Sequence, residues 1–431
     1  MTTTTHRRLL NALLTMTMVG ATATLQAQPI VVTTTAELQA ALTPANAGKR
    51  IVVRAGEYEI SQALTVPDDA TLVGEGEMIF DESGLPTGFA PSGRTVLRST
   101  PALVGDVLTL GDGATLRGLV IDDALGRTGG NVVVVSSRAA GDFISALLAE
   151  CEIINPNPAG IVPAGPTGSA LVAITRNPNL GQDPPPHEGA VLRVEMRRSI
   201  VRSPSRGTGV FAINFAPHSE IGLVLQRNVI GAGLVTTGGV SRPDAVTGST
   251  VSIESRRNVY WNQSGLAGIL GWNLIGGAGS PAFPSAPSTL NRLQVHSRED
   301  TVQGFRLGVV AIGGQRYLEG SEPSSSNRLE MDLHGLRVQT TTEPLAADLV
   351  LFGARSFVNG VPPGDGNTLR LVLRKSTGSG PRANAYGHSS TPSMGDLGVG
   401  NQLEIVGSET AFVRSNDGIE PIPSAEFFTE Q

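Results

Sequence analysis

Residues 327–335 read NRLEMDLHG, and the pattern of this stretch returns through the C-terminal half of the chain. The close copies are NRLQVHSRE from Asn291, NTLRLVLRK from Asn367 and NQLEIVGSE from Asn401, and the looser copies are AVLRVEMRR from Ala190, SEIGLVLQR from Ser219 and STVSIESRR from Ser249. Apolar and polar residues alternate within each copy, and side chains along a β-strand point alternately to opposite faces. Each copy therefore predicts a strand with one apolar face and one face that mostly meets water.

The spacing of the copies indicates a repeat architecture. Their first apolar residues lie 29 residues apart at the closest (Leu192 to Ile221) and 42 at the widest (Val251 to Leu293). A period of this size is typical of solenoids, propellers and arrays. A second apolar strand recurs as GVFAINF, AGILGWN, GVVAIGG and ADLVLFG, beginning at residues 209, 267, 308 and 347. Propeller blades need four antiparallel strands each, whereas stacked coils tolerate one loop of variable length, so we expect a solenoid of parallel strands.

Asparagine heads four copies at the same position: Asn291, Asn327, Asn367 and Asn401. Asparagine favours turn conformations, and its side-chain amide can hydrogen-bond to an equivalent amide in a stacked strand. We expect a ladder of asparagine side chains at this corner of the solenoid.

The composition fits many short strands joined by turns. The 431 residues include 53 Gly and 28 Pro, while aromatic residues make up only 4% and charged residues only 16%. This profile does not suit a helical bundle or a disordered chain. The net charge of −6 argues against nucleic acid as a partner, because nucleic-acid-binding proteins favour basic surfaces.

The N-terminus has the pattern of an export signal over residues 1–27. His6, Arg7 and Arg8 precede an uncharged apolar stretch, and small residues follow, with cleavage expected after Ala23 or Ala27. No other run reaches the roughly 18 apolar residues of a membrane span. We therefore expect a secreted or periplasmic protein with no membrane span after signal cleavage.

The next residues predict a helical cap, which we assign to residues 28–48. Thr34 and Glu37 form a capping-box pattern at the start of TTAELQAAL, so a short helix is expected there. The stretch IVVRAGEYEISQALTVPDDATLVGEG, from Ile51, then alternates short strands with turns.

This cap, the closely spaced first strands and the stacked strands with asparagine corners resemble the right-handed parallel β-helix of the pectin-lyase-like superfamily. The resemblance implies an all-β fold, a right-handed single-stranded parallel β-helix (solenoid) with a short N-terminal capping helix. On this basis the β-helix domain covers residues 49–415 and a C-terminal tail covers 416–431. The superfamily includes lyases, hydrolases, esterases and proteins without catalysis, so the resemblance implies the fold more than the activity.

Stacked copies would align their outward residues in columns. The first column is Glu195, Val224, Glu254, His296, Asp332, Val372 and Val406. The second column is Arg197, Gln226, Arg256, Arg298, His334, Arg374 and Ser408. Opposite charges on adjacent strands stabilise a sheet by roughly 0.2–1 kcal/mol per pair, which is one explanation of this pattern.

The second explanation is a groove that binds an acidic polysaccharide. Arginine would neutralise the carboxylates of a uronate chain, and histidine titrates near neutral pH and suits proton transfer in a β-elimination. The candidate catalytic residues are His296, His334 and Asp332, and the candidate substrate-binding residues are Arg256, Arg298, Glu330, Arg374, Trp261 and Trp272. The two histidines have the alternative of being solvent-exposed surface residues, and the tryptophans have the alternative of packing in the core or in loops.

The sequence patterns for glycoside hydrolysis and for calcium binding are weaker. Asp122 and Asp123 are a carboxylate pair after an apolar strand, as a glycoside hydrolase would need, but such a pair at a strand end is far more often a turn. The two GDG stretches, at 111–113 and 364–366, lack the spacing of a full set of calcium ligands and are expected to be turns. We therefore predict no metal and no cofactor.

Two functions follow from these patterns. One is an exported protein that binds or cleaves an acidic polysaccharide, by lyase-type β-elimination if it is an enzyme. The alternative is a non-catalytic envelope or surface scaffold whose rigid rod mediates macromolecular binding. The signatures of polygalacturonases and pectate lyases are absent as recognisable runs, so the choice depends on the site and not on the fold.

Overall fold

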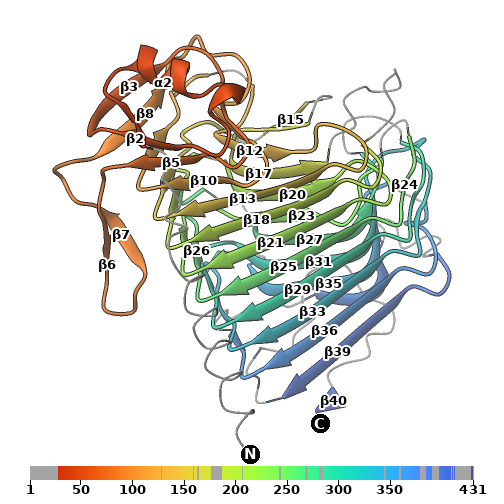
Figure 1. The fold of residues 1–431 in the computed structure, drawn as a ribbon. Helices are drawn as coiled ribbons and strands as arrows, with labels where there is room; N and C mark the ends of the chain where they lie inside the picture. Colours follow the sequence, from red (N-terminus) through yellow and green to blue (C-terminus); the bar gives the residue numbers. More distant parts are fainter. Residues whose placement is uncertain are drawn as a thin grey trace, which may run out of the picture.

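Between residues 50 and 390 each turn of the chain supplies one strand to each of three parallel sheets, and successive turns stack along one axis (Figure 1). The computed structural model describes residues 28–127, 129–158, 160–162, 165–175, 187–205, 207–241, 244–266, 270–280, 285–343, 346–358, 361–378, 385–390, 398–408, 410, 412 and 429–430. The predicted export signal and most of the predicted tail lie outside these residues.

The three sheets are long, with 13 strands in sheet A and ten each in sheets B and C over the described residues. Sheet A contains β1 (Ile30–Val32), β2 (Arg50–Val53), β5 (Thr71–Gly74), β10 (Ala114–Arg117), β13 (Phe143–Ala149), β18 (Val191–Arg197), β21 (Glu220–Gln226), β25 (Thr250–Arg256), β29 (Arg292–Arg298), β33 (Arg328–His334), β36 (Thr368–Arg374), β39 (Gln402–Ser408) and β40 (Thr429–Glu430). Sheet B contains β3 (Gly56–Ile60), β8 (Thr95–Ser99), β11 (Val120–Asp122), β14 (Glu152–Ile154), β19 (Ile200–Arg202), β22 (Val229–Ile230), β26 (Val259–Trp261), β30 (Thr301–Gln303), β34 (Arg337–Gln339) and β37 (Thr377–Gly378). Sheet C contains β4 (Leu64–Val66), β9 (Leu108–Leu110), β12 (Val133–Ser136), β17 (Ser169–Thr175), β20 (Thr208–Asn214), β23 (Leu234–Thr237), β27 (Leu270–Ala278), β31 (Leu307–Arg316), β35 (Ala347–Ser356) and β38 (Ala385–Ser390).

The order of the strands shows how the coil winds. A strand of sheet A is followed by a strand of sheet B and then by one of sheet C, and every pairing within the three sheets is parallel. In Figure 1 sheet A crosses the front from right to left while the chain descends from the N-terminal cap, so the coil is right-handed. The predicted right-handed parallel β-helix is confirmed. The repeated NRLEMDLHG-like stretches are the strands of sheet A.

Two hairpins and one small sheet lie outside the three long sheets in the described residues. Two antiparallel hairpins are formed by β6 (Met78–Phe80) with β7 (Pro86–Phe89) and by β15 (Gly160–Val162) with β16 (Gly165–Thr167). A small parallel sheet joins β24 (Val246–Thr247), β28 (Ser288–Thr289) and β32 (Ser324–Ser325). The β6–β7 hairpin projects to one side of the first coils in Figure 1.

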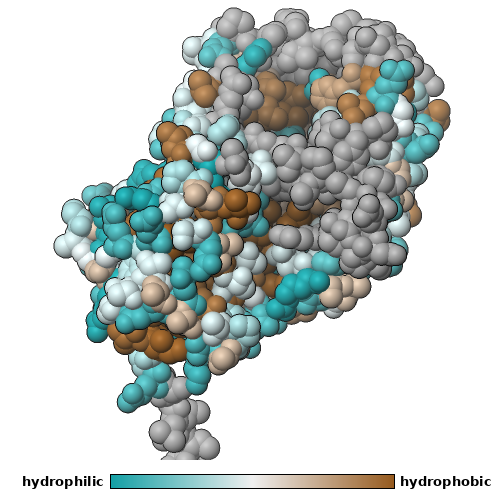
Figure 2. Space-filling view, turned by 90° about the horizontal axis from the view of Figure 1, so that it is seen from above, coloured by the Kyte–Doolittle hydropathy of each residue, from teal (hydrophilic) through white to brown (hydrophobic). Residues whose placement is uncertain are grey.

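The N-terminal cap contains α2 (Thr35–Ala41) and the 3₁₀ helix η1 (Pro44–Asn46). The predicted capping box is present, because Thr34 and Glu37 each accept a hydrogen bond from the other's backbone N–H. Leu38 and Ala41 are buried, and α2 covers the end of the stack, where hydrophilic and hydrophobic residues share the described surface (Figure 2). No helix in the described ranges has the length and apolar character needed to cross a membrane.

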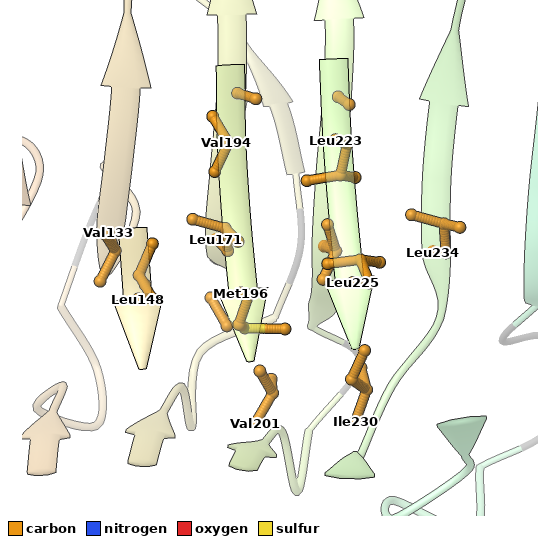
Figure 3. Close-up of a cluster of buried hydrophobic side chains, with 14 of the residues drawn as sticks. Val133, Leu148, Leu171, Val194, Met196, Val201, Leu223, Leu225, Ile230 and Leu234 are labelled. Atoms are coloured by element: carbon orange, nitrogen blue, oxygen red, sulfur yellow. The ribbon is translucent and has the colours of Figure 1, made fainter. Parts of the chain in front are cut away.

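The interior of the coil is filled by apolar side chains from all three sheets. Val194 and Leu223 come from sheet A, Ile230 from sheet B, and Leu171 and Leu234 from sheet C, and they point toward one another between the strands (Figure 3). None of these five is more than 1% exposed. In-register pairing places Leu192, Ile221 and Val251 above one another in sheet A, so each apolar position of the repeat forms a buried column.

The predicted asparagine ladder is present at the corner that enters sheet A. The side-chain amide of Asn291 donates to Oδ1 of Asn327 at 3.1 Å, and the same bond joins Asn327 to Asn367 and Asn367 to Asn401, each at 3.1 Å. Each Oδ1 also accepts the backbone N–H of the asparagine in the preceding coil. The ladder therefore satisfies backbone groups that would be buried without a partner.

A second ladder, absent from the sequence-based expectations, lies at the corner between sheets A and B. Asn228 donates to Oδ1 of Asn258 at 2.9 Å, and Asn258 donates to Oδ1 of Asp300 at 3.1 Å. Asp300 is buried and also accepts hydrogen bonds from the Asn258 backbone N–H (2.7 Å) and the Ser297 hydroxyl (2.6 Å). Burial raises the pKa of Asp300 to about 6, although these hydrogen bonds oppose the shift.

We expect Asn327→Ala to destabilise the protein strongly. The change leaves the backbone N–H of Asn291 without its acceptor and removes one of the three acceptors of its side-chain amide, and an unsatisfied buried group costs about 1–3 kcal/mol. The midpoint of thermal unfolding should fall clearly below that of a Gln339→Ala control, which truncates an exposed amide at the end of β34. Equal midpoints for the two variants would contradict a structural role of the ladder.

We expect Asp300→Asn to stabilise the protein at neutral pH. The folded state holds the Asp300 proton more tightly than the unfolded chain, so this carboxyl loses stability as the pH rises from about 4 through its folded pKa of about 6. Asparagine keeps the Oδ1 acceptor and cannot ionise. The variant should gain up to about 3 kcal/mol at pH 7, and the gain should vanish near pH 4. Unfolding midpoints of both proteins across this range provide the measurement, and a gain that does not change with pH would refute the assignment.

Candidate functional site

The outward columns predicted on sheet A are present in register. His296 lies opposite Asp332, and Arg298 lies opposite His334, in the paired strands β29 and β33. In the next coil β36 places Val372 beside Asp332 and Arg374 beside His334. Because alternate residues of each strand point inward, these side chains share the outer face while Leu293, Val295 and Met331 fill the core.

The structure brings most of the predicted site residues together. A depression of about 500 Å³ is lined by both histidines and by Asp332, Arg256, Arg298 and Arg374. A neighbouring depression, also about 500 Å³, contains Glu330 and shares His296, Asp332 and Arg374 with the first.

These depressions belong to a longer groove, which we call the sheet A groove. A third depression, over β10, β13, β18, β21 and β25, shares Glu195, Val224 and Glu254 with the depression around the histidines. A fourth, toward the N-terminal coils, shares Arg197 and Gln226 with it. The shared residues make the groove continuous along the stack, on the sheet that faces the viewer in Figure 1.

The acidic residue Glu330 of the groove forms ion pairs with two arginines. Glu330 is held by Arg292, whose Nε lies 3.0 Å from Oε2, and by Arg328. Burial raises the pKa of Glu330, but the hydrogen bonds and charges of these two arginines outweigh it and bring the pKa below its ordinary value. Glu330 is thus a structural anchor for two guanidinium groups, and its contact with a substrate stays a prediction.

Several other groups in the groove are not engaged by the described residues. Arg256 and Arg298 form no ion pair with any described residue. The two histidines are likewise without a hydrogen bond from that part of the chain. Asp332 is 3.7 Å from Arg374, and its Oδ1 is buried with no hydrogen-bond partner in the described ranges. These side chains are therefore available for a ligand.

The tryptophans do not belong to this site. Trp272 is 0% exposed and packs edge-on against the buried Tyr260, with ring centroids 5.4 Å apart. The prediction that Trp272 contacts a saccharide is therefore wrong, because the repeat places it on the inward face of β27. Trp261 is partly exposed at the end of β26 in sheet B, and it does not line the four depressions described on sheet A.

The Asp122–Asp123 pair does not form an open pair of carboxylates. Asp122 is bound by Arg98 at 3.0 Å on the surface of sheet B. Asp123 is buried, and it accepts hydrogen bonds from Ser99 (2.6 Å), Arg127 (2.7 Å) and Asn157 (2.8 Å). This network fastens the loop after β11 and leaves no free oxygen for hydrolysis.

Metal binding finds no support in the geometry. In the described ranges no three or more His, Cys, Asp or Glu side chains are grouped so as to hold a metal ion. Asp112 of the first GDG stretch accepts hydrogen bonds from the backbone and side chain of Ser145, and Asp365 of the second accepts one from the backbone of Val399. Both stretches are turns tied to the neighbouring coil.

Basic residues at the corner between sheets A and B were missed in the sequence. Arg198, Arg227 and Arg257 each follow the last residue of a sheet A strand and have positive φ angles of 48°, 54° and 55°. The signal was the arginine doublet that closes some copies, as in MRRS and SRRN. The doublet places one arginine on the sheet and the next on the corner beside it.

No protein-family model matches the chain, and no curated protein sequence matches it. Among solved structures, the chain is similar to the full-length tailspike protein 2 of Escherichia coli O157:H7 bacteriophage CAB120, with 11% identity, a TM-score of 0.38 and 84% of this chain covered. It spans only 38% of the length of that tailspike chain. It is also similar to the A-module of the mannuronan C-5 epimerase AlgE6 of Azotobacter vinelandii, with 14% identity, a TM-score of 0.38, and 89% of this chain and 96% of that chain covered. A third similar structure is the PL6 family polysaccharide lyase Pedsa3628 of Pseudopedobacter saltans, with 12% identity, a TM-score of 0.25, and coverage of 91% and 94%. At this level the likeness concerns the fold alone, which the sheet topology of the chain establishes by itself: a right-handed parallel β-helix.

Proposed function

We propose that the sheet A groove binds an acidic polysaccharide and that its middle coils cleave this polymer by β-elimination. The observation that carries the proposal is the pair of unengaged arginines, Arg256 and Arg298, beside two unengaged histidines in one depression of about 500 Å³. An anionic polymer is typical of the outside of a cell, which fits the export signal predicted at residues 1–27.

The arginine column suits a chain of regularly spaced carboxylates. Arg256 and Arg298 occupy equivalent positions in adjacent coils, and adjacent parallel strands lie about 4.8 Å apart. Guanidinium groups bind carboxylates through two parallel hydrogen bonds, which fixes orientation as well as charge. A polyuronate lying along the stack would therefore meet arginine in the two adjacent coils of Arg256 and Arg298, and again at Arg374 two coils further on.

Elimination needs a base, an acid and a neutralised carboxylate. The base removes the proton from the carbon that bears the carboxylate, a double bond forms to the neighbouring carbon, and the glycosidic C–O bond on that neighbour breaks. The departing oxygen takes the electron pair of that bond and receives a proton from the acid. Arginine bound to the uronate stabilises the negative charge that develops during proton removal.

The positions of the two histidines support a different proposed role for each. We assign His334 to removal of the proton, because it lies between Arg298 and Arg374, which would hold the uronate carboxylate next to that proton. His296 lies in the neighbouring column beside Asp332, and we assign it to delivery of a proton to the leaving oxygen. Asp332 lies opposite His296 and two residues before His334, so in this proposal it orients the imidazoles when a substrate is bound.

A scaffold without catalysis is the second candidate, and one observation favours it. Charges on sheet A and at its corner with sheet B neutralise one another between coils, as in the pairs Arg370–Glu404 (3.0 Å) and Arg257–Glu299 (2.6 Å). Such pairs stabilise the stack and leave a surface of low net charge. Under this alternative, the groove binds a polymer or a partner surface without altering it.

The test is to incubate the protein with polygalacturonate, alginate and glycosaminoglycans and to follow the ultraviolet absorbance of the new conjugated double bond. His334→Ala should lower kcat by about 10²- to 10⁴-fold, the usual contribution of a general base. Arg298→Ala should raise KM by about tenfold or more, because a hydrogen bond to a charged group contributes about 1.5–3 kcal/mol.

The matched control is Arg337→Ala, which removes an exposed arginine from sheet B and should leave both constants unchanged. Absence of unsaturated products with every polymer would overturn the elimination. Polymer affinity that is equal in the Arg298→Ala and Arg337→Ala proteins would overturn the binding groove.

A further inference from the structure

The N-terminal end of the sheet A groove is a cleft of about 590 Å³ that differs in charge from the middle coils. It is lined by Arg50, Arg117, Arg197, Arg198, Arg227 and Glu150, together with a few apolar and hydroxyl side chains. We propose that this arginine cleft is a separate binding site for densely charged oxyanions, namely sulfate or phosphate ester groups carried on a saccharide. The proposal does not rest on the elimination reaction.

The charges in the arginine cleft do not balance. Glu150 receives the Nε and Nη2 groups of Arg117 at 3.1 and 3.0 Å, and Arg198 approaches its other oxygen at 3.8 Å. Arg197 pairs with Glu195, which lies just outside the cleft. Five guanidinium groups thus face two carboxylates, which leaves an excess of three positive charges.

Two of these arginines have no acidic partner at all in the described chain. Arg50 is exposed at the start of β2, and Arg227 is half-buried at the corner that follows β21. Neither forms an ion pair with a described residue. In the middle coils, by contrast, Glu195, Glu254 and Asp332 accompany the four arginines of the depression.

The backbone and one aromatic ring hold the cationic groups in place. Arg117 and Arg197 project from β10 and β18, and Ala149 lies between them in the same column, so space remains between the two guanidinium groups. Arg198 lies over the ring of Phe80, 5.3 Å from its centroid, and Phe80 belongs to the β6–β7 hairpin. A cation–π contact of this kind positions the guanidinium without neutralising its charge.

The size and the charge of the arginine cleft together select the ligand. A volume of about 590 Å³ lies in the range of small-molecule sites, roughly 300–1,000 Å³. A uronate brings one carboxylate per sugar, whereas sulfated or phosphorylated sugars bring several charges in the same volume. Val73, Leu147 and Ala149 supply an apolar surface for the carbon-bound hydrogens of a sugar ring. The arrangement therefore favours a short saccharide with several sulfate or phosphate esters over a plain uronate.

The proposal is tested by isothermal titration calorimetry at one fixed ionic strength with the full chain. The probes are a heparin-type sulfated tetrasaccharide, a phosphorylated oligosaccharide of similar length, and tetragalacturonate. We expect a sulfated or phosphorylated probe to bind at least tenfold more tightly than tetragalacturonate. The stronger of the two identifies which ester the cleft recognises.

Two double variants test whether the preferred probe binds in the arginine cleft. Arg50→Ala with Arg227→Ala should weaken binding of the preferred probe at least tenfold, and both changes remove side chains that stabilise no described ion pair. Arg256→Ala with Arg298→Ala, equally free of ion pairs, should leave that affinity unchanged. Equal losses in the two double variants, or tetragalacturonate binding as tightly as the esters, would overturn the proposal. Loss of unsaturated products in the Arg256/Arg298 variant tests the elimination, whereas loss of binding of the sulfated or phosphorylated probe in the Arg50/Arg227 variant tests the arginine cleft, so failure of one proposal is distinguishable from failure of the other.

Discussion

The in-register pairing of successive coils is the constraint on which the rest of the molecule depends. Every residue of a sheet A strand lies beside its equivalent in the next coil, so one choice of residue type is repeated as a column along the axis. Inward columns of Leu, Ile and Val form the core, and burial of each such side chain contributes about 1.5–3 kcal/mol. At two corners of the coil, the side-chain ladders let buried polar residues satisfy one another.

The same in-register pairing determines which side chains lie together on the outer surface. Loops of different length absorb the variation between repeats, and coils 30 and 42 residues long still place Val224, Glu254 and His296 in one column. A groove along the stack follows directly, because its lining residues are equivalent positions of one repeat. Its character changes along the axis with the residues that occupy these positions, from an arginine excess in the first coils to mixed charges around the histidines.

The repeated strands of sheet A could be predicted from the sequence, whereas short strands and side chains that occur only once could not. The sheet A strands were readable because seven alternating residues recur with an asparagine at their head, and the cap was readable from Thr34 and Glu37. Most of sheet B was not readable, since strands of two or three residues, such as β22, carry no periodicity. Because the strands of sheet B that follow Asn228, Asn258 and Asp300 were not predicted, nothing in the sequence indicated that these three residues stack at a corner.

The candidate site was predictable to a similar degree. The order of the columns placed His296, Asp332 and His334 together, and the structure confirms this arrangement. Trp272 was assigned to the wrong side, because a single tryptophan in an apolar strand gives no indication of which face it occupies. The arginine cleft combines residues from Arg50 to Arg227, and only the stacking of six coils brings them to one place. A site of this kind can be recognised only when the three-dimensional stacking of the coils is known.

Distance measurement between paired spin labels tests this register most directly. The single cysteine, Cys151, is fully buried, and burial raises the pKa of its thiol to about 12, so it should not react with the label. Cysteines introduced in place of Arg197 and Arg374 lie five coils apart, which predicts a separation of about 24 Å. Labels in place of Arg117 and Arg374 lie seven coils apart, which predicts about 34 Å. Distances of about 24 and 34 Å for the two pairs support the parallel stack, and distances that depart clearly from these values or show no increase between the two pairs would contradict it.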